Sequence, residues 1–159
     1  KEALADEIRA QIRRCREHGI PITHLDAHHS LHTIWEVASI VIPIARQERI
    51  AYIRLKSNME LSTVPFRFKL YTGIFNRRLK IARLAKTRYF GSTEQYLALR
   101  QRLRSSDEMR SVEICVHPRL NGNGELKNII FGEEAGLEAQ IKLIDSYRES
   151  VSYSGARYI

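Results

Sequence analysis

The sequence has few cysteines and no long apolar run, and these two absences narrow the classes of protein to which it can belong. Its two cysteines, Cys15 and Cys115, lie far apart and form no CxxC pair, so neither a disulfide framework nor a thiolate zinc site is predicted. No apolar run approaches the roughly 18 residues of a membrane helix, and no secretion signal pattern is present. We therefore expect a protein of the cytoplasm with no membrane partner.

The charge is unbalanced, with a net value of +8 over 159 residues. Such an excess suits a polyanionic partner. Much of it, however, falls between Arg67 and Arg88, where basic and apolar residues alternate as in an amphipathic helix with a solvated basic face. Because few exposed aromatic residues are expected there and no nucleic-acid motif is visible, we do not expect a nucleic-acid partner.

Apolar periodicity predicts an alternation of helices and short strands along the chain. Helices are predicted at residues 2–18, 34–47, 65–84, 94–104 and 133–150, and strands at 22–25, 51–53, 89–90 and 112–116. Pro43 should kink or divide the second helix, Gly73 is a candidate break in the third, and residues 119–128 read as a loop. This order predicts an α/β fold of right-handed βαβ units, a partial (β/α)-barrel with parallel strands, formed by residues 1–159 as a single domain.

Side chains capable of chemistry follow three of the predicted strands. Asp26 and His28 come after the first strand, Arg54 after the second, and His117 after the strand at 112–116. In parallel α/β folds the ligand site lies at the carboxyl ends of the strands. We therefore expect these side chains to border one site.

Four of the six histidines fall between His24 and His32, close to Asp26. Imidazole and carboxylate groups are the ligands of a catalytic metal ion, and Asp26 and His28 would face the same side of an extended segment. Alternatively, Asp26 orients an imidazole through its ring N–H. We expect a structural role for His24, and the sequence leaves both interpretations open for His32.

A second candidate group surrounds the strand at 112–116. Pro118 restricts the backbone of His117, whose side chain suits a general acid, although it could equally cap a buried strand. Glu113 alternates into the predicted interior, where an acid needs a partner. Arg54 is either that partner or a substrate contact.

Two of these segments resemble motifs of a known family. Residues 21–32, preceded by residues 7–12 and Gly19, resemble the D-S-H-x-H-x-H segment of the YdjC-like carbohydrate deacetylases, the chitooligosaccharide deacetylase family. Residues 112–118 resemble the family's later E-L-x-x-H-P strand, and Arg54 lies between the two motifs as it does in the family.

This resemblance implies a (β/α)-barrel-like enzyme that removes acetyl groups from N-acetylated sugars with a divalent ion, magnesium or zinc. By the same mapping His28 is a metal ligand, Asp26 and His117 are catalytic, and Arg54, Glu113 and His32 bind substrate or support the site. A carboxylate base would take the proton of the attacking water.

The sequence also departs from the family pattern. The motifs N-A-D-D-F-G and G-x-H-L, which hold the family's other metal ligands, do not occur in it, Ser30 stands where a histidine is usual, and Arg119 replaces a glycine. We therefore expect low metal occupancy and interpret the sequence as the C-terminal portion of a deacetylase domain, with the base in a preceding segment, or as a relative that has lost catalysis. A basic polyanion-binding module and a non-catalytic, self-associating remnant are the alternatives.

Overall fold

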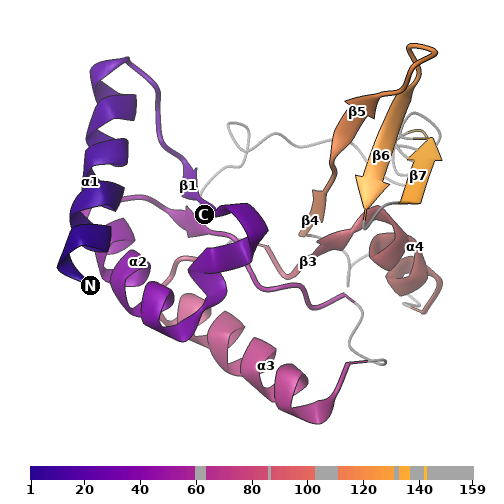
Figure 1. Ribbon diagram of the computed structural model, residues 1–159. Coiled ribbons are helices and arrows are strands. Elements are labelled where there is room, and N and C mark those ends of the chain that lie inside the picture. Colours follow the sequence, from indigo (N-terminus) through magenta and orange to yellow (C-terminus); the bar gives the residue numbers. More distant parts are fainter. Residues whose placement is uncertain (60–63, 86, 103–110, 131–132, 137–141, 143–159) are drawn as a thin grey trace.

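The computed structural model describes residues 1–59, 64–85, 87–102, 111–130, 133–136 and 142 (Figure 1). Helices and short strands alternate through its first 115 residues, as predicted. The helices are α1 (Glu2–Glu17), α2 (Trp35–Gln47), α3 (Phe66–Ile81) and α4 (Thr93–Arg102), with the 3₁₀ helix η1 (His28–Thr33) before α2. The strands of this part are β1 (His24–Leu25), β2 (Tyr52–Ile53), β3 (Tyr89–Ser92) and β4 (Val112–Cys115).

The four strands form two parallel pairs, β1 with β2 and β3 with β4. Asn58, in the segment that follows β2, connects the pairs. Its backbone N–H donates to the carbonyl oxygen of Phe90 at 3.0 Å, and its side-chain oxygen accepts from the N–H of Phe90 at 2.9 Å. The predicted α/β class with parallel strands is therefore confirmed. No closed barrel forms among the described residues, so the partial barrel remains a prediction.

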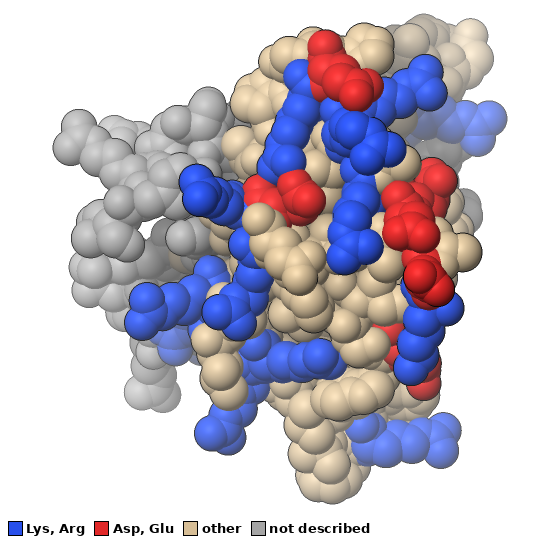
Figure 2. Space-filling model, turned by 90° about the vertical axis from the view of Figure 1, so that its left-hand side faces the viewer, with Lys and Arg blue, Asp and Glu red and all other residues tan. Residues whose placement is uncertain are grey.

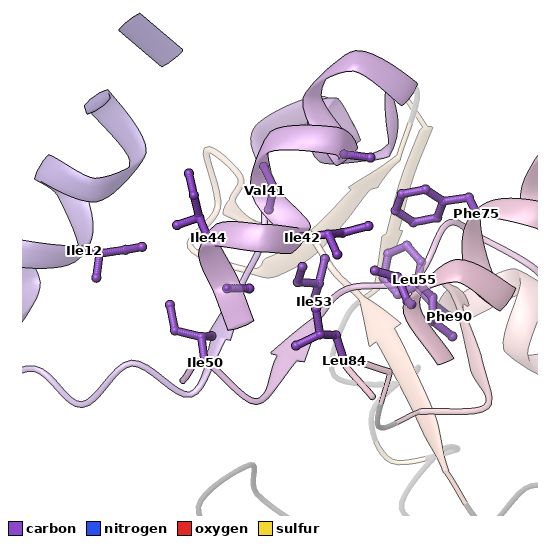
Figure 3. Close-up of a cluster of buried hydrophobic side chains, with 13 residues drawn as sticks. Ile12, Val41, Ile42, Ile44, Ile50, Ile53, Leu55, Phe75, Leu84 and Phe90 are labelled. Carbon is purple, nitrogen blue, oxygen red and sulfur yellow. The ribbon is translucent and has the colours of Figure 1, made fainter. Parts of the chain in front are cut away.

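One hydrophobic core holds the helices against the first strands (Figure 3). It combines Ile12 of α1, the buried face of α2, Phe75 and Leu79 of α3, and Ile53 of β2. A second, smaller cluster of Met59, Tyr96 and Leu99 packs against residues of β3 and β4. Burial of each such side chain contributes about 1.5–3 kcal/mol, so these two clusters fix the positions from which the strands emerge.

Neither Pro43 nor Gly73 divides its helix, and a kink at Pro43 remains a prediction. Helix α2 runs through Pro43, which is exposed, and α3 runs through Gly73, where an added Cβ atom would meet no other atom within 4 Å. Proline can occupy a helix that tertiary packing stabilises on its other face, and Ile42, Ile44 and Ala45 are buried on either side of Pro43.

Downstream of β4 the predicted secondary structure is wrong. Residues 119–128, expected as a loop, contribute to a hairpin of β5 (Pro118–Leu120) and β6 (Leu126–Ile130). The side-chain oxygen of Asn121 accepts the N–H groups of Asn123 and Glu125, and Gly124 takes a φ of 75°. This Asn- and Gly-rich stretch forms a tight turn because the Asn121 side chain accepts hydrogen bonds from backbone N–H groups of the turn itself.

The last predicted helix, 133–150, is also wrong at its start. Residues Glu133–Gly136 form β7, which pairs antiparallel with β6 and completes a three-stranded sheet at the end of the molecule opposite α1 (Figure 1). Most of the remaining residues of that predicted helix lie outside the described part. Pairing with β6 prevailed over the helical periodicity, which is a weak local preference.

The exposed surface of α3 carries both basic and large apolar side chains. The predicted solvated basic face therefore describes only part of it. Its buried side carries Thr72, Phe75, Asn76 and Leu79. Five large apolar residues are exposed on the same helix as the exposed Arg67, Arg77 and Lys80: Phe66, Phe68, Leu70, Ile74 and Ile81. On the side of the molecule that carries α1, basic and acidic side chains are interleaved (Figure 2), and Arg9–Asp6 and Arg16–Glu48 are ion pairs.

In the described part of the chain, no helix is long and apolar enough to cross a membrane.

The start of α4 provides a test of the local sequence signal at Ser92. The run Gly91-Ser92-Thr93 predicts an N-cap before the helix at 94–104. The structure has a reciprocal capping box there, in which Ser92 Oγ accepts the N–H of Gln95 at 3.3 Å and Gln95 Oε1 accepts the N–H of Ser92 at 3.0 Å. We expect Ser92→Ala to lower the free energy of unfolding by about 1 kcal/mol in urea denaturation. Ser39→Ala, which removes a hydroxyl from within α2, is the matched control and should cost nothing. Equal losses in both variants would contradict a capping role.

Candidate active site at the strand ends

Arg54, the first residue after β2, is the centre of the candidate site. Its Nε lies 2.9 Å from Asp26 Oδ1, its Nη2 donates to Ser30 Oγ at 3.0 Å, and its Nη1 lies 4.0 Å from Cys115 Sγ. The guanidinium also stacks over the Phe90 ring at 4.6 Å. Only 11% of the side chain is exposed. One cation thus joins the carboxyl ends of β1, β2 and β4, as the rule for parallel sheets predicts.

Asp26 connects Arg54 to the histidine segment. Its Oδ1 also accepts the N–H of Ala27 at 2.6 Å, and the side chain is 38% exposed. Arg54 thus has a carboxylate partner in Asp26, which the sequence did not suggest, and substrate contact by Arg54 remains a prediction. The planar guanidinium suits such a carboxylate contact better than an ammonium would.

His32 lies beneath this ion pair and is 2% exposed. Its Nε2 lies 3.0 Å from the carbonyl oxygen of Arg54, and its Nδ1 lies 3.4 Å from Asp26 Oδ1. Because a carbonyl oxygen only accepts, Nε2 must carry the ring proton and Nδ1 is bare when the ring is neutral. Burial lowers the pKa of His32, against the opposing effect of the Asp26 charge. Asp26 therefore lies beside an imidazole but accepts no ring N–H from the neutral His32, so an orienting role for Asp26 remains a prediction.

The backbone between Asp26 and His32 is conformationally strained. His29 and Ser30 have φ values of 52° and 57°, in the left-handed region that non-glycine residues rarely adopt. This turn aims Ser30 Oγ at Arg54 and buries the His32 ring. Strain of this kind is concentrated at functional sites, where surrounding contacts hold it.

His28 and His29 remain on the surface. Both are exposed, with their ring centroids 4.2 Å apart in an edge-on arrangement. Among the described residues, no three His, Cys, Asp or Glu side chains gather as a metal-binding group would require. The donors present therefore do not fit a complete metal centre, and His28 as a metal ligand remains a prediction.

The residues of β4 border the site without all entering it. Glu113 accepts a hydrogen bond from the buried Tyr52 hydroxyl, which also lies 3.2 Å from Thr87 Oγ1. The acid therefore has a partner, as expected of a partly buried carboxylate. His117 is exposed where β4 passes into β5, and its backbone N–H donates to Asn128 Oδ1 at 2.8 Å. Substrate binding by Glu113 and catalysis by His117 remain predictions.

Four contributors to the site were missed by sequence reasoning. Ser30, Phe90 and Cys115 contact the Arg54 guanidinium, and burial raises the pKa of the Cys115 thiol although Arg54 opposes the shift. Asn76 holds the segment after Arg54 through hydrogen bonds with both the N–H and the carbonyl of Lys56. Of these four residues, only Asn76 could have been noticed in the sequence, because it is a polar amide on the apolar side of α3.

Comparison with known proteins adds one finding. The model of a family described as "YdjC-like protein" matches residues 1–145. No curated protein and no solved structure matches the chain.

The pKa of His32 predicts a pH-dependent stability. Since the folded-state pKa lies below the ordinary value of 6.5, the unfolded chain binds more protons between the two values, and stability is lost as the pH falls through this window. We expect the free energy of unfolding to decrease as the pH falls from neutral to below 6.5 in urea titrations, and His32→Gln to reduce that dependence. His18→Gln, which removes an exposed histidine, is the control. An unchanged pH dependence in His32→Gln would contradict the assignment.

Proposed function

This chain belongs to the YdjC-like family, and from that membership and the geometry around Arg54 we propose that it hydrolyses the acetamide group of N-acetylated sugars. The family supports a carbohydrate deacetylase-like function in general terms. The observation that carries the proposal is the junction at Arg54, where the ends of three parallel strands meet around one ion pair. This is the place where folds of this class bind substrates.

The residues divide into those that position and those that react. Asp26, His32 and Ser30 hold Arg54 in place, and the small exposed part of its guanidinium offers a donor to a sugar hydroxyl or carbonyl. Hydrolysis joins a water oxygen to the acetyl carbon and breaks the C–N bond, so the leaving amine must gain a proton. We assign that proton to His117, whose exposed ring follows β4. We propose that the proton of the attacking water passes to a carboxylate that acts as general base.

The family implies a divalent cation, magnesium or zinc, and we propose His28 as its only ligand in the described part. Because one imidazole binds such an ion weakly, activity should require added metal in excess.

The proposal is tested by acetate release from N,N′-diacetylchitobiose in the presence of added magnesium or zinc. We expect Arg54→Met to lower kcat/KM by at least about tenfold, equivalent to ~1.4 kcal/mol of transition-state binding. Arg9→Met, which removes an arginine from an exposed pair with Asp6, is the matched control and should leave the rate unchanged. Absence of acetate release by the unmodified chain with either ion would overturn the proposal.

The role of His117 has a separate signature. His117→Asn removes the proton donor, so kcat should fall about a hundredfold while KM changes little. The same variant should lose less rate on a substrate whose leaving group needs no proton, such as 4-nitrophenyl acetate. A proportional loss on both substrates would assign His117 a structural role instead.

Two alternatives remain predictions. Polyanion binding would have to weaken steeply with added salt, and self-association would show as a mass that depends on concentration. The basic residues of α3 support the first and its exposed apolar residues the second, but neither observation is connected to the site at Arg54.

A further inference from the structure

A groove of about 580 Å³ opens next to the ion pair of Asp26 and Arg54. Its walls come from α1 and α2 and are mainly apolar: Leu4, Ile8, Ile12, Cys15, Val37 and Val41. Where β1 runs into η1, the lining includes Leu25, Asp26, Leu31 and His32. The cavity therefore combines an apolar wall with a few polar groups, which is the usual composition of a small-molecule site.

The polar part of the groove contains an acceptor that lacks a donor. Within the described residues, His32 Nδ1 has no hydrogen-bond partner, although the side chain is 2% exposed. Asp26 Oδ1, which lies 3.4 Å from Nδ1, is itself an acceptor. Because Nε2 faces the Arg54 carbonyl, the bare Nδ1 can only accept. A buried acceptor without a donor is costly, and a ligand that brings an N–H or O–H group to this point would remove that cost.

We propose that the groove binds the acyl chain of an N-acylated amino sugar, with the amide N–H of the ligand donating to His32 Nδ1. The preferred acyl group is then longer than acetyl, because a two-carbon group would leave most of the apolar wall in contact with water. The choice of an N-acyl sugar rests on the proposed function. The groove itself and its unpaired acceptor do not.

The test compares N-hexanoylglucosamine with N-acetylglucosamine by calorimetric titration of the whole chain. Each methylene that becomes fully buried should tighten binding about three- to fourfold, so the four additional methylenes should lower Kd by at least about tenfold. The ¹⁵N signal of His32 Nδ1 should shift upfield on binding, as expected for a bare imidazole nitrogen that accepts a hydrogen bond. Equal affinities for the two sugars, or an unchanged His32 signal, would overturn the inference.

A matched pair of variants locates the effect. Leu4 lines the groove and is 40% exposed, whereas Leu70 on α3 is 53% exposed and does not line it. Leu4→Trp should fill the groove and abolish the preference for the longer chain, while Leu70→Trp should retain it. Retention of the preference in Leu4→Trp would also overturn the inference.

The outcomes separate this inference from the proposed function. If the hexanoyl sugar binds tightly but no acetate is released in the assay described above, the groove assignment stands and the deacetylase proposal falls. If acetate is released with no dependence of binding on chain length, the reverse holds.

Discussion

The ion pair between Asp26 and Arg54 is the interaction on which the arrangement of the site depends. It fixes the exit of β1 to the exit of β2, and the remaining nitrogens of the same guanidinium reach Ser30 and Cys115. Without it, the strained turn at His29 and Ser30 would lose the contact that offsets its backbone cost. His32 would also be affected, because its Nε2 lies 3.0 Å from the carbonyl oxygen of Arg54. The geometry is therefore a network, in which the removal of one partner affects several others.

Much of this arrangement could be predicted from the sequence because it follows from local signals and a topological rule. The helices appear from apolar periodicity, the cap of α4 from Ser92, and the convergence of Asp26 and Arg54 from their places after parallel strands. What could not be predicted depends on contacts distant in sequence. The partners of Arg54 at Phe90 and Cys115 are of this kind and carry no local signature. The pairing of β7 with β6 is local, and there the helical periodicity of the sequence was misleading.

The histidine cluster shows how composition and geometry can diverge. Four histidines near one aspartate suggest a single group of ligands, yet the fold separates them. His32 is buried against Arg54, while His28 and His29 are exposed at the surface of the turn. The positive φ values at His29 and Ser30 produce this division. Membership of the YdjC-like family therefore identifies the kind of chemistry, while the donor atoms in the described part supply only a fraction of a metal centre.

The reach of Arg54 along the chain also has a consequence for how the protein folds. Its side-chain partners Ser30 and Cys115 lie 24 and 61 positions away in sequence, so loop closure over those distances must precede the formation of the site. An intermediate that has assembled α1, α2 and β2 but not β4 would contain a core without a functional centre. The contacts of Arg54 should accordingly form after the helices during refolding, and they should be the first lost when β4 detaches.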